Sequence, residues 1–329
     1  MSPGIGHRVD RIVALMVGAF LLTVSPVGVR NVRAQSIHPD AGTYALTLLN
    51  GGLGPVGSAL AEGLTAWPGV GTDAVYWNPA AAAGLGPRLE LTGSRLFGEA
   101  EQTALAWATR VGRAGLSIQL HYSGLDGIEV REGPTTEPLA LTSAYDLVGA
   151  VSGALRLAEG LDAGLGVKLL YEKLDLADAF GVALDVGVQV ILPRMSWLRA
   201  GLAVRNIGRM GAFETERPRL PWTTAFGLAL TEPYRLGDWS LSAGFDIWRP
   251  ADDWTQLRLG VEAAHQALRL RLGHRLGEGW NTLSAGAGFV HRGWRLDYAY
   301  TFDPDADRRA LGAIQRLGLT LDLGSGKEY

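Results

Sequence analysis

The first stretch whose spacing could carry chemistry is rich in glycine. Gly52, Gly54 and Gly57 match the G-x-G-x-x-G pattern that cradles a dinucleotide pyrophosphate. Asp73 stands about 20 residues further on, where that fold places its ribose-binding acid. However, no strand leads to Asp73, and no alternation of strands and helices follows, as such a fold requires. We interpret the motif as part of a segment folded tightly inside the lumen of the β-barrel that the rest of the sequence predicts. A nucleotide site is the minor alternative.

Metal and catalytic patterns are weak. The six histidines are scattered without ligand spacing, and the absence of cysteine excludes thiolate sites and cysteine nucleophiles. Asp303, Asp305 and Asp307 resemble the opening of a calcium loop, but Arg308 and Ile314 replace its glycine and closing glutamate. A solvated acidic loop is the main interpretation, with one loosely bound Ca²⁺ as the alternative. We assign no catalytic, cofactor-binding or metal residue and expect the protein not to be an enzyme.

Composition and the first residues predict export to a membrane. The 329 residues are 47% hydrophobic and only 19% charged, with 45 glycines and 10 tryptophans. Residues 1–34 read as a signal peptide: Arg8 and Arg11 precede the apolar run 12–24, and a cleavage site follows near Ala34. That run is shorter than the roughly 20 residues of a spanning helix, although an uncleaved anchor is the alternative. The net charge of −3, more negative still without residues 1–34, argues against nucleic acid as a partner.

The rest of the chain has two parts that differ in composition and in residue pattern. Residues 35–87 are rich in Gly, Ala and Pro, whereas from Arg88 onward apolar residues alternate with polar or small ones at the strand period of two. This pattern predicts an all-β domain at 88–329 preceded by a plug segment at 35–87. The predicted strands are 88–97, 103–110, 114–123, 145–157, 161–174, 179–192, 197–206, 222–230, 239–248, 256–265, 267–274, 282–291, 294–302 and 314–323.

The two faces of these strands differ in charge. A soluble sandwich would turn the apolar face inward, whereas a transmembrane antiparallel β-barrel turns it toward lipid and places the charges in its lumen. Periodicity alone does not separate the two. On the barrel interpretation, the lumen-lining residues are Asp185, Asp246, Arg258, Glu262, Arg269, Arg271 and Asp297. Because their signs are mixed, we expect them to pair and the barrel to be occluded.

Connection lengths favour the barrel. The odd-to-even connections include the long segments 124–144, 207–221, 249–255 and 303–313. The even-to-odd connections are mostly tight, as at 111–113 and 292–293, although 231–238 is longer than expected. Long loops on one rim and short turns on the other are typical of outer-membrane barrels, so we expect the protein in the cell outer membrane.

A family resemblance rests on an Asn-Pro-Ala box. The segment from Gly71 to Leu85, which contains Asp73, Trp77, Asn78 and Pro79, resembles the N-terminal signature of the PorV/PorQ family, a relative of the FadL-type transporters. Later matches come in the same order along the chain, at 204–208, 220–230, 296–300 and 315–324.

The resemblance implies a FadL-like barrel of about fourteen strands with the N-terminal segment in its lumen. Asp73, Trp77, Asn78 and Pro79 would then form a structural plug motif, since Asn can donate and accept hydrogen bonds and Pro fixes a turn. Ligand gating by this motif is the functional alternative.

Two functions remain open on this resemblance. The first is a non-enzymatic component of a type IX-style secretion system that binds or shuttles exported proteins at the cell surface. The alternative is a FadL-like passive transporter of hydrophobic small molecules. Expected partners are therefore outer-membrane lipid, together with secreted proteins or secretion-system subunits in the first case and a hydrophobic small molecule in the second.

Overall fold

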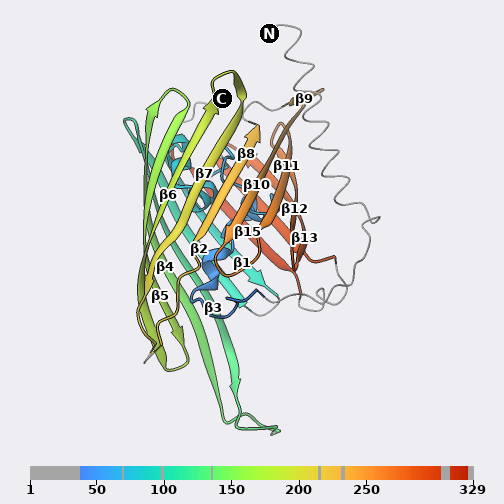
Figure 1. Cartoon of the computed structure of the whole chain (residues 1–329). Coiled ribbons are helices and arrows are strands. Elements are labelled where there is room, and N and C mark those ends of the chain that lie inside the picture. The colour runs from blue at the N-terminus through green and yellow to red at the C-terminus, as the bar shows by residue number, and fades with distance from the viewer. Residues whose placement is uncertain are drawn as a thin grey trace.

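The protein folds into one closed antiparallel β-barrel around an N-terminal segment (Figure 1). The computed structural model describes residues 38–68, 70–97, 100–134, 136–213, 216–230, 234–304 and 312–324. The predicted signal peptide and its cleavage site lie outside these residues. No helix among the described residues is long and apolar enough to cross a membrane.

Fourteen strands form the barrel wall, as the sequence predicts. Each strand pairs with its neighbours in chain order, and β15 pairs with β1 to close the ring. The short β9 pairs only with β10 and lies outside the ring. The strands are β1 (Arg88–Leu96), β2 (Ala100–Val111), β3 (Ala114–Val130), β4 (Ala140–Ala158), β5 (Leu161–Leu174), β6 (Ala177–Leu192), β7 (Met195–Met210), β8 (Thr223–Leu230), β9 (Tyr234–Leu236), β10 (Trp239–Pro250), β11 (Gln256–His265), β12 (Leu268–Gly277), β13 (Trp280–His291), β14 (Trp294–Phe302) and β15 (Ile314–Asp322).

The wall has its apolar face outside. In β6 the side chains of Val182, Leu184, Val186 and Val188 are exposed, whereas Ala183, Asp185 and Gln189 between them are buried. A water-soluble protein of this size would not expose such a continuous apolar belt, so the outer surface is suited to lipid. Aromatic rings from β3 to β6 also contact one another in a row (Tyr122, Tyr145, Tyr171 and Phe180), as in the girdle of a membrane barrel.

The predicted connection 124–144 is wrong over most of its length. β3 and β4 continue to pair as far as Val130 and Ala140, with a register shift between Leu125 and Ile128. The resulting hairpin projects well beyond the barrel, at the bottom of Figure 1. Outside the membrane neither face of a strand meets lipid, so the alternation fades from the sequence while the backbone pairing persists.

The two rims differ as the sequence predicts. The long connections, including the β3–β4 hairpin, share one rim, called here the loop rim. On the other rim, called the turn rim, every connection has two residues except the one that contains β9, which lies at the top of Figure 1. The connection after β8, longer than the rule for turns, is partly taken up by β9.

Residues 38–87, called the hatch, precede the barrel and pack inside it. The hatch contains η1 (Thr47–Asn50), α2 (Pro55–Ala59), α3 (Thr72–Trp77) and η2 (Pro79–Gly84). Helix α2 contacts β12 to β15, whereas η2 contacts β3 to β6. Because the hatch touches wall segments far apart around the ring, its buried side chains cross the lumen and form the main hydrophobic core.

Candidate functional site

The glycine motif of the hatch wraps around the hatch's own carboxylates. The Gly52 amide donates to Glu62 Oε1 at 2.8 Å, and the Gly57 amide donates to Asp73 Oδ2 at 3.0 Å. A Cβ on Gly54 would lie 1.9 Å from Asp73 Oδ1, so only glycine fits there. These contacts give the G-x-G-x-x-G spacing a structural reason, because the amides that would meet a phosphate already hold side-chain oxygens.

Glu62 joins the hatch to three strands. Its carboxylate lies 3.8 Å from Arg258 of β11 and 3.4 Å from Arg316 of β15, and it also pairs with Arg275 of β12. Burial alone would raise the pKa of Glu62, but the three guanidinium groups and the Gly52 amide outweigh it and lower the pKa to about 2. The hatch is therefore anchored to one side of the wall by a buried, ionised carboxylate.

Asp73 is held differently. Among the described residues it is buried without an ion pair to any arginine or lysine, and burial raises its pKa to about 6. The nearby charge of Glu90 adds to this rise, whereas the Gly57 amide opposes it. Glu90 itself accepts a hydrogen bond from the Thr72 amide at 3.1 Å, so Thr72, the neighbour of Asp73, ties α3 to β1.

Asn78 and Pro79 sit where the hatch meets the opposite wall. Asn78 Nδ2 donates to the carbonyl of Thr65 at 2.8 Å and to that of Val188 in β6 at 3.1 Å. Its Oδ1 accepts from the Ala80 amide at 3.0 Å and thereby caps η2. The side chain thus satisfies backbone groups of the hatch and of the wall together, in keeping with the structural role proposed for the plug motif.

Inward-facing glycines make room for this box. A Cβ on Gly187 would lie 2.0 Å from Asn78 Oδ1, and one on Gly164 would lie 2.4 Å from the backbone of Pro79. The hatch therefore rests directly on the backbone of β5 and β6. Part of the high glycine content of the strands follows from this close approach.

Trp77 lies between two arginines of the wall. The guanidinium carbons of Arg205 and Arg258 lie 4.5 and 4.9 Å from its ring, and Arg258 also stacks 3.9 Å from the ring of Trp248. Trp77 is fully buried, so these cation–π contacts are shielded from water and at the strong end of their range. They hold α3 from both sides.

The seven predicted lumen residues fall into two groups. Those buried within the barrel are Asp185, Asp246, Arg258, Arg271 and Asp297. Glu262 and Arg269 are only partly buried, and Arg269 bonds to backbone carbonyls of Gln266 and Leu268 near the turn rim.

Opposite charges pair along the wall or with the hatch. Arg271 lies 2.7 Å from both Glu262 and Asp297, on the two strands that flank β12 and β13. Lys168 lies 2.7 Å from Asp185. Asp246 accepts hydrogen bonds from the amide and hydroxyl of Thr65 in the hatch. The expected pairing is present, but it joins neighbouring strands and the hatch, because the hatch occupies the space between facing walls.

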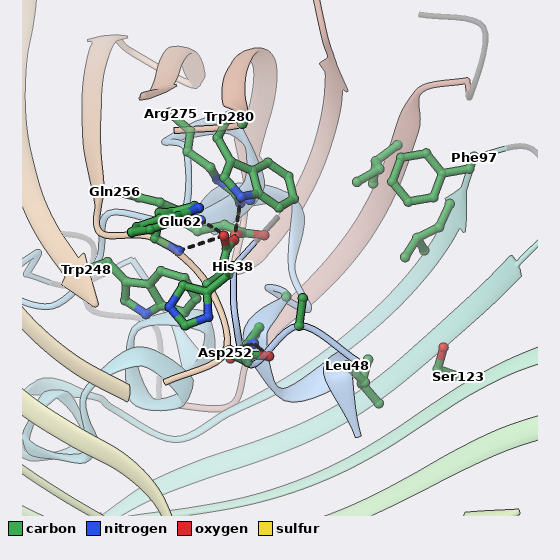
Figure 2. Close-up of a pocket in the computed structure, with 18 of the residues that line it drawn as sticks. His38, Leu48, Glu62, Phe97, Ser123, Trp248, Asp252, Gln256, Arg275 and Trp280 are labelled. Atoms are coloured by element: carbon green, nitrogen blue, oxygen red, sulfur yellow. Dashed lines mark hydrogen bonds and ion pairs between the residues drawn. The ribbon is translucent and has the colours of Figure 1, made fainter. Parts of the chain in front are cut away.

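A cavity of about 650 Å³ opens above the hatch at the loop rim. Figure 2 shows Trp248, Trp280 and Arg275 on one side of it and Phe97 with Ser123 on the other. A second cavity of about 210 Å³ lies deeper, between α2 and the wall. The two share lining residues, namely Glu62, Phe97, Arg275, Gly279, Trp280, Ile314 and Arg316.

Three residues that line the larger cavity also carry polar atoms that are themselves buried and have no protein partner. Among the described residues, the indole nitrogen of Trp248 and the Nε atoms of Arg275 and Arg316 are buried and unpaired. The apolar part of its lining comes from aromatic and aliphatic side chains, namely Trp248, Trp254, Trp280, Phe97, Leu48, Leu96, Ala41 and Ile314. Charged side chains, among them Glu62, Asp252, Asp253 and Arg275, line the rest. Apolar surface combined with placed polar groups is usual in small-molecule sites.

Sequence analysis missed several residues that organise this region: Glu62, Arg205, Arg275, Trp280 and Arg316. For Glu62, the sequence does contain an indication of its role. Between residues 41 and 87 the only charged side chains are Glu62 and Asp73, and an isolated charge in an apolar plug needs a partner. Within the described part of the chain, no three His, Asp or Glu side chains are grouped closely enough to hold a metal. The acidic run from Asp303 falls partly outside that part.

The inverted wall, the two unequal rims and the internal hatch together define a FadL-like β-barrel with an outer surface suited to lipid. Solved structures share this fold. The "CymD monoaromatic hydrocarbon channel" matches with a TM-score of 0.60 at 13% identity, covering 83% of this chain and 98% of its own. The Pseudomonas putida toluene transporter TodX matches with a TM-score of 0.60 at 12% identity, covering 84% of this chain and 99% of its own. A Pseudomonas aeruginosa FadL homologue matches with a TM-score of 0.52 at 10% identity, covering 83% and 98%.

These likenesses concern the fold, since the identities are low. No family model matches the sequence, and no curated protein matches it. The predicted FadL-like barrel is confirmed. The narrower PorV/PorQ resemblance finds no support in the comparisons.

Proposed function

We propose that the protein is a passive outer-membrane channel for hydrophobic small molecules. The observation that carries this proposal is the aromatic cavity of about 650 Å³ at the loop rim, which adjoins a second cavity beside the hatch. Its volume lies within the roughly 300–1,000 Å³ of typical small-molecule sites.

The lining favours an apolar substrate over a sugar or an ion. Tryptophan, phenylalanine and leucine side chains line part of the larger cavity beside its charged residues, and the smaller cavity exposes mainly apolar atoms. Removing apolar surface from water stabilises binding by about 25 cal/mol per Å². The hatch crosses the lumen, and its described side chains are buried against strands on both sides of the barrel. A hydrophobic molecule would be concentrated at the loop rim and then pass inward as the hatch contacts yield.

The named neighbours point to the same substrate class. CymD is described as a monoaromatic hydrocarbon channel and TodX as a toluene transporter. Toluene is therefore a suitable first probe, with oleate as a longer hydrophobic molecule and glucose as a polar control.

The decisive experiment fills the deeper cavity. Thr282 of β13 lines it, whereas Ala285 on the same strand is exposed on the lipid face. Thr282→Trp should reduce uptake of radiolabelled toluene and oleate by Gram-negative host cells to the rate of cells without the protein. Ala285→Trp adds the same bulk to the outside and should leave uptake unchanged. The proposal fails if the unaltered protein reaches the outer membrane yet speeds uptake of neither probe, or if both variants behave alike.

The secretion hypothesis remains a prediction that rests on the box at Asp73, Asn78 and Pro79. A tagged full-length chain would test it by pull-down from native membranes. Recovery of exported proteins that share a C-terminal sorting domain would favour secretion, whereas solvent-extractable hydrophobic molecules in the purified protein would favour transport.

A further inference from the structure

A third cavity lies at the turn rim, at the opposite end of the barrel from the two cavities described above. It has a volume of about 400 Å³ and lies between the β2–β3 and β4–β5 turns. Arg110, Arg113 and Arg156 line it, together with a single acidic residue, Glu159. Its side chains therefore carry a net charge of +2, which no part of the proposed transport function requires.

The arginines differ in how firmly they are held. Arg110 donates to the carbonyl of Ala83 at 2.6 Å and so joins the end of the hatch to the wall. Arg156 pairs with Asp162 at 2.9 Å, but Arg199 also lies 3.7 Å from that carboxylate, so the two arginines share one aspartate. The side chain of Arg113 has neither a hydrogen bond nor an ion pair within the described residues, and it is exposed.

Apolar side chains adjoin the arginines on the outside of the barrel. Val111 and Leu157, next to the two turns, are 62% and 61% exposed. Further along the same wall, Leu116 lies opposite Gly153, and Gly153 lies opposite Leu165. Arg110 and Arg156 lie on the inner face of their strands, whereas Val111 and Leu157 lie on the outer face. A lipid headgroup would therefore reach the arginines across the two-residue turns at the rim while its chains lie along the outside of the strands.

Glycines on this wall leave space for chains. On β4, Gly149 and Gly153 lie on the outer face between leucines of β3 and β5. A Cβ on Gly149 would meet nothing within 4 Å, and one on Gly153 would meet only Leu116 at 3.7 Å. The glycines thus form two notches in the lipid-facing surface below the arginine cluster.

The rim itself favours a phospholipid of the inner leaflet. Short turns of outer-membrane barrels face the periplasm, where the leaflet consists of glycerophospholipids. Arginine is suited to phosphate because its planar fork forms paired, charge-assisted hydrogen bonds. The loop rim, in contrast, carries exposed acidic residues on the β3–β4 hairpin: Asp126, Glu129, Glu132 and Glu137.

We propose that the cavity formed by Arg110, Arg113 and Arg156 binds the phosphate of an anionic glycerophospholipid, whose acyl chains lie against the glycine-notched face of β3 to β5. Bound there, the lipid would bridge the two turns next to the end of the hatch. The site recognises phosphate and an apolar chain together, which distinguishes it from a site for free phosphate or for an acidic protein.

The test uses the full-length mature protein in detergent, with native mass spectrometry as the readout. The probes are dioleoyl phosphatidylglycerol, dioleoyl phosphatidylcholine, glycerophosphoglycerol without acyl chains, and inorganic phosphate. Arg113→Gln is the test variant, because Arg113 has no structural partner to lose. Arg292→Gln is the matched control, since Arg292 is an exposed arginine on the β13–β14 turn of the same rim and its loss changes the net charge equally.

Phosphatidylglycerol should be retained in preference to phosphatidylcholine. Arg113→Gln should weaken its binding about fivefold or more, the effect of one arginine near a phosphate surface, and Arg292→Gln should leave it within about twofold. A heat-shift gel confirms that each variant is folded. The proposal is overturned if the two phospholipids bind equally or if both variants bind alike. It is also overturned if the chain-free headgroup or inorganic phosphate displaces the lipid at equal concentration, or if an acidic soluble protein is captured through Arg113 while lipid is not.

Discussion

The ion pairs between Glu62 and its three arginines anchor the hatch, and the structure predicts the effect of removing them most clearly. The ionised carboxylate is stabilised so strongly that its pKa falls from 4.5 to about 2. At about 1.4 kcal/mol per pKa unit, this difference corresponds to about 3 kcal/mol in favour of the charged form. Glu62→Gln keeps the shape of the side chain but removes the charge, so it should lower the free energy of hatch opening by about 3 kcal/mol. Breaking a buried ion pair by removing one partner typically costs 3–5 kcal/mol, in agreement.

Thiol labelling can measure this opening, because the chain contains no cysteine. Val75 in α3 is 1% exposed, so a Val75→Cys reporter reacts only when the hatch leaves its place. A loss of 3 kcal/mol raises the open population, and hence the labelling rate, by about a hundredfold. Glu101→Gln on exposed β2 is the matched control and should leave the rate unchanged. A heat-shift gel shows whether the barrel itself remains folded.

Acid should have the same effect on the unaltered hatch. Because the pKa of Glu62 is lowered on folding, its stabilising contribution is complete above pH 4.5 and is lost as the pH falls toward 2. Labelling with dithiodipyridine, which reacts with thiols in acid, should therefore accelerate over this window in the reporter protein and not in the Glu62→Gln variant. The reasoning is refuted if Glu62→Gln labels within about threefold of the Glu101→Gln control at neutral pH.

Three further predictions use the same labelling assay. Asn78→Ala strands buried backbone groups and should cost about 1–3 kcal/mol in hatch opening, visible as labelling at least about fivefold faster; an unchanged rate would show that this side chain does not hold the hatch. Gly187→Ala should displace the hatch, because its Cβ would lie 2.0 Å from Asn78, whereas Gly149→Ala, on the open outer face, should not; equal rates would contradict the close packing. The pKa of Asp73 is raised to about 6 by burial, so its protonated form stabilises the hatch below pH 3.8 and this stability is lost as the pH rises through 6. Asp73→Asn should abolish that loss, and a pH profile between 4 and 8 identical to that of the parent would count against it.

The wall could be predicted from the sequence because its rule is local. The side chains of every strand must alternate between lipid and lumen at a period of two. Each of the fourteen strands can therefore be recognised from a few consecutive residues. The predicted strand boundaries were wrong where the alternation between lipid and lumen no longer applies. β3 runs to Val130 and not to residue 123, because beyond the membrane the backbone pairing continues without an apolar face.

The hatch could be predicted only as a region. Its glycines were recognised as a motif, yet their reason lies in the carboxylates of Glu62 and Asp73, which fold back over 10 and 16 residues. Asn78 and Pro79 were singled out through a resemblance. The glycines that receive them, Gly164 and Gly187, lie on strands far along the chain, and nothing in their neighbourhood marks them among the many other strand glycines.

The sequence by itself determined fourteen alternating strands, an apolar outer face and inward charges of mixed sign. Periodicity carries all of this, because side-chain direction along a strand depends only on neighbouring residues. The tertiary structure decided which charges meet. Arg258, Arg275 and Arg316 converge on Glu62 from 196 to 254 residues away, and that convergence depends on closure of the ring around the hatch. The cavity above it follows from the same closure, since its walls come from strands and loops that only the closed barrel brings together.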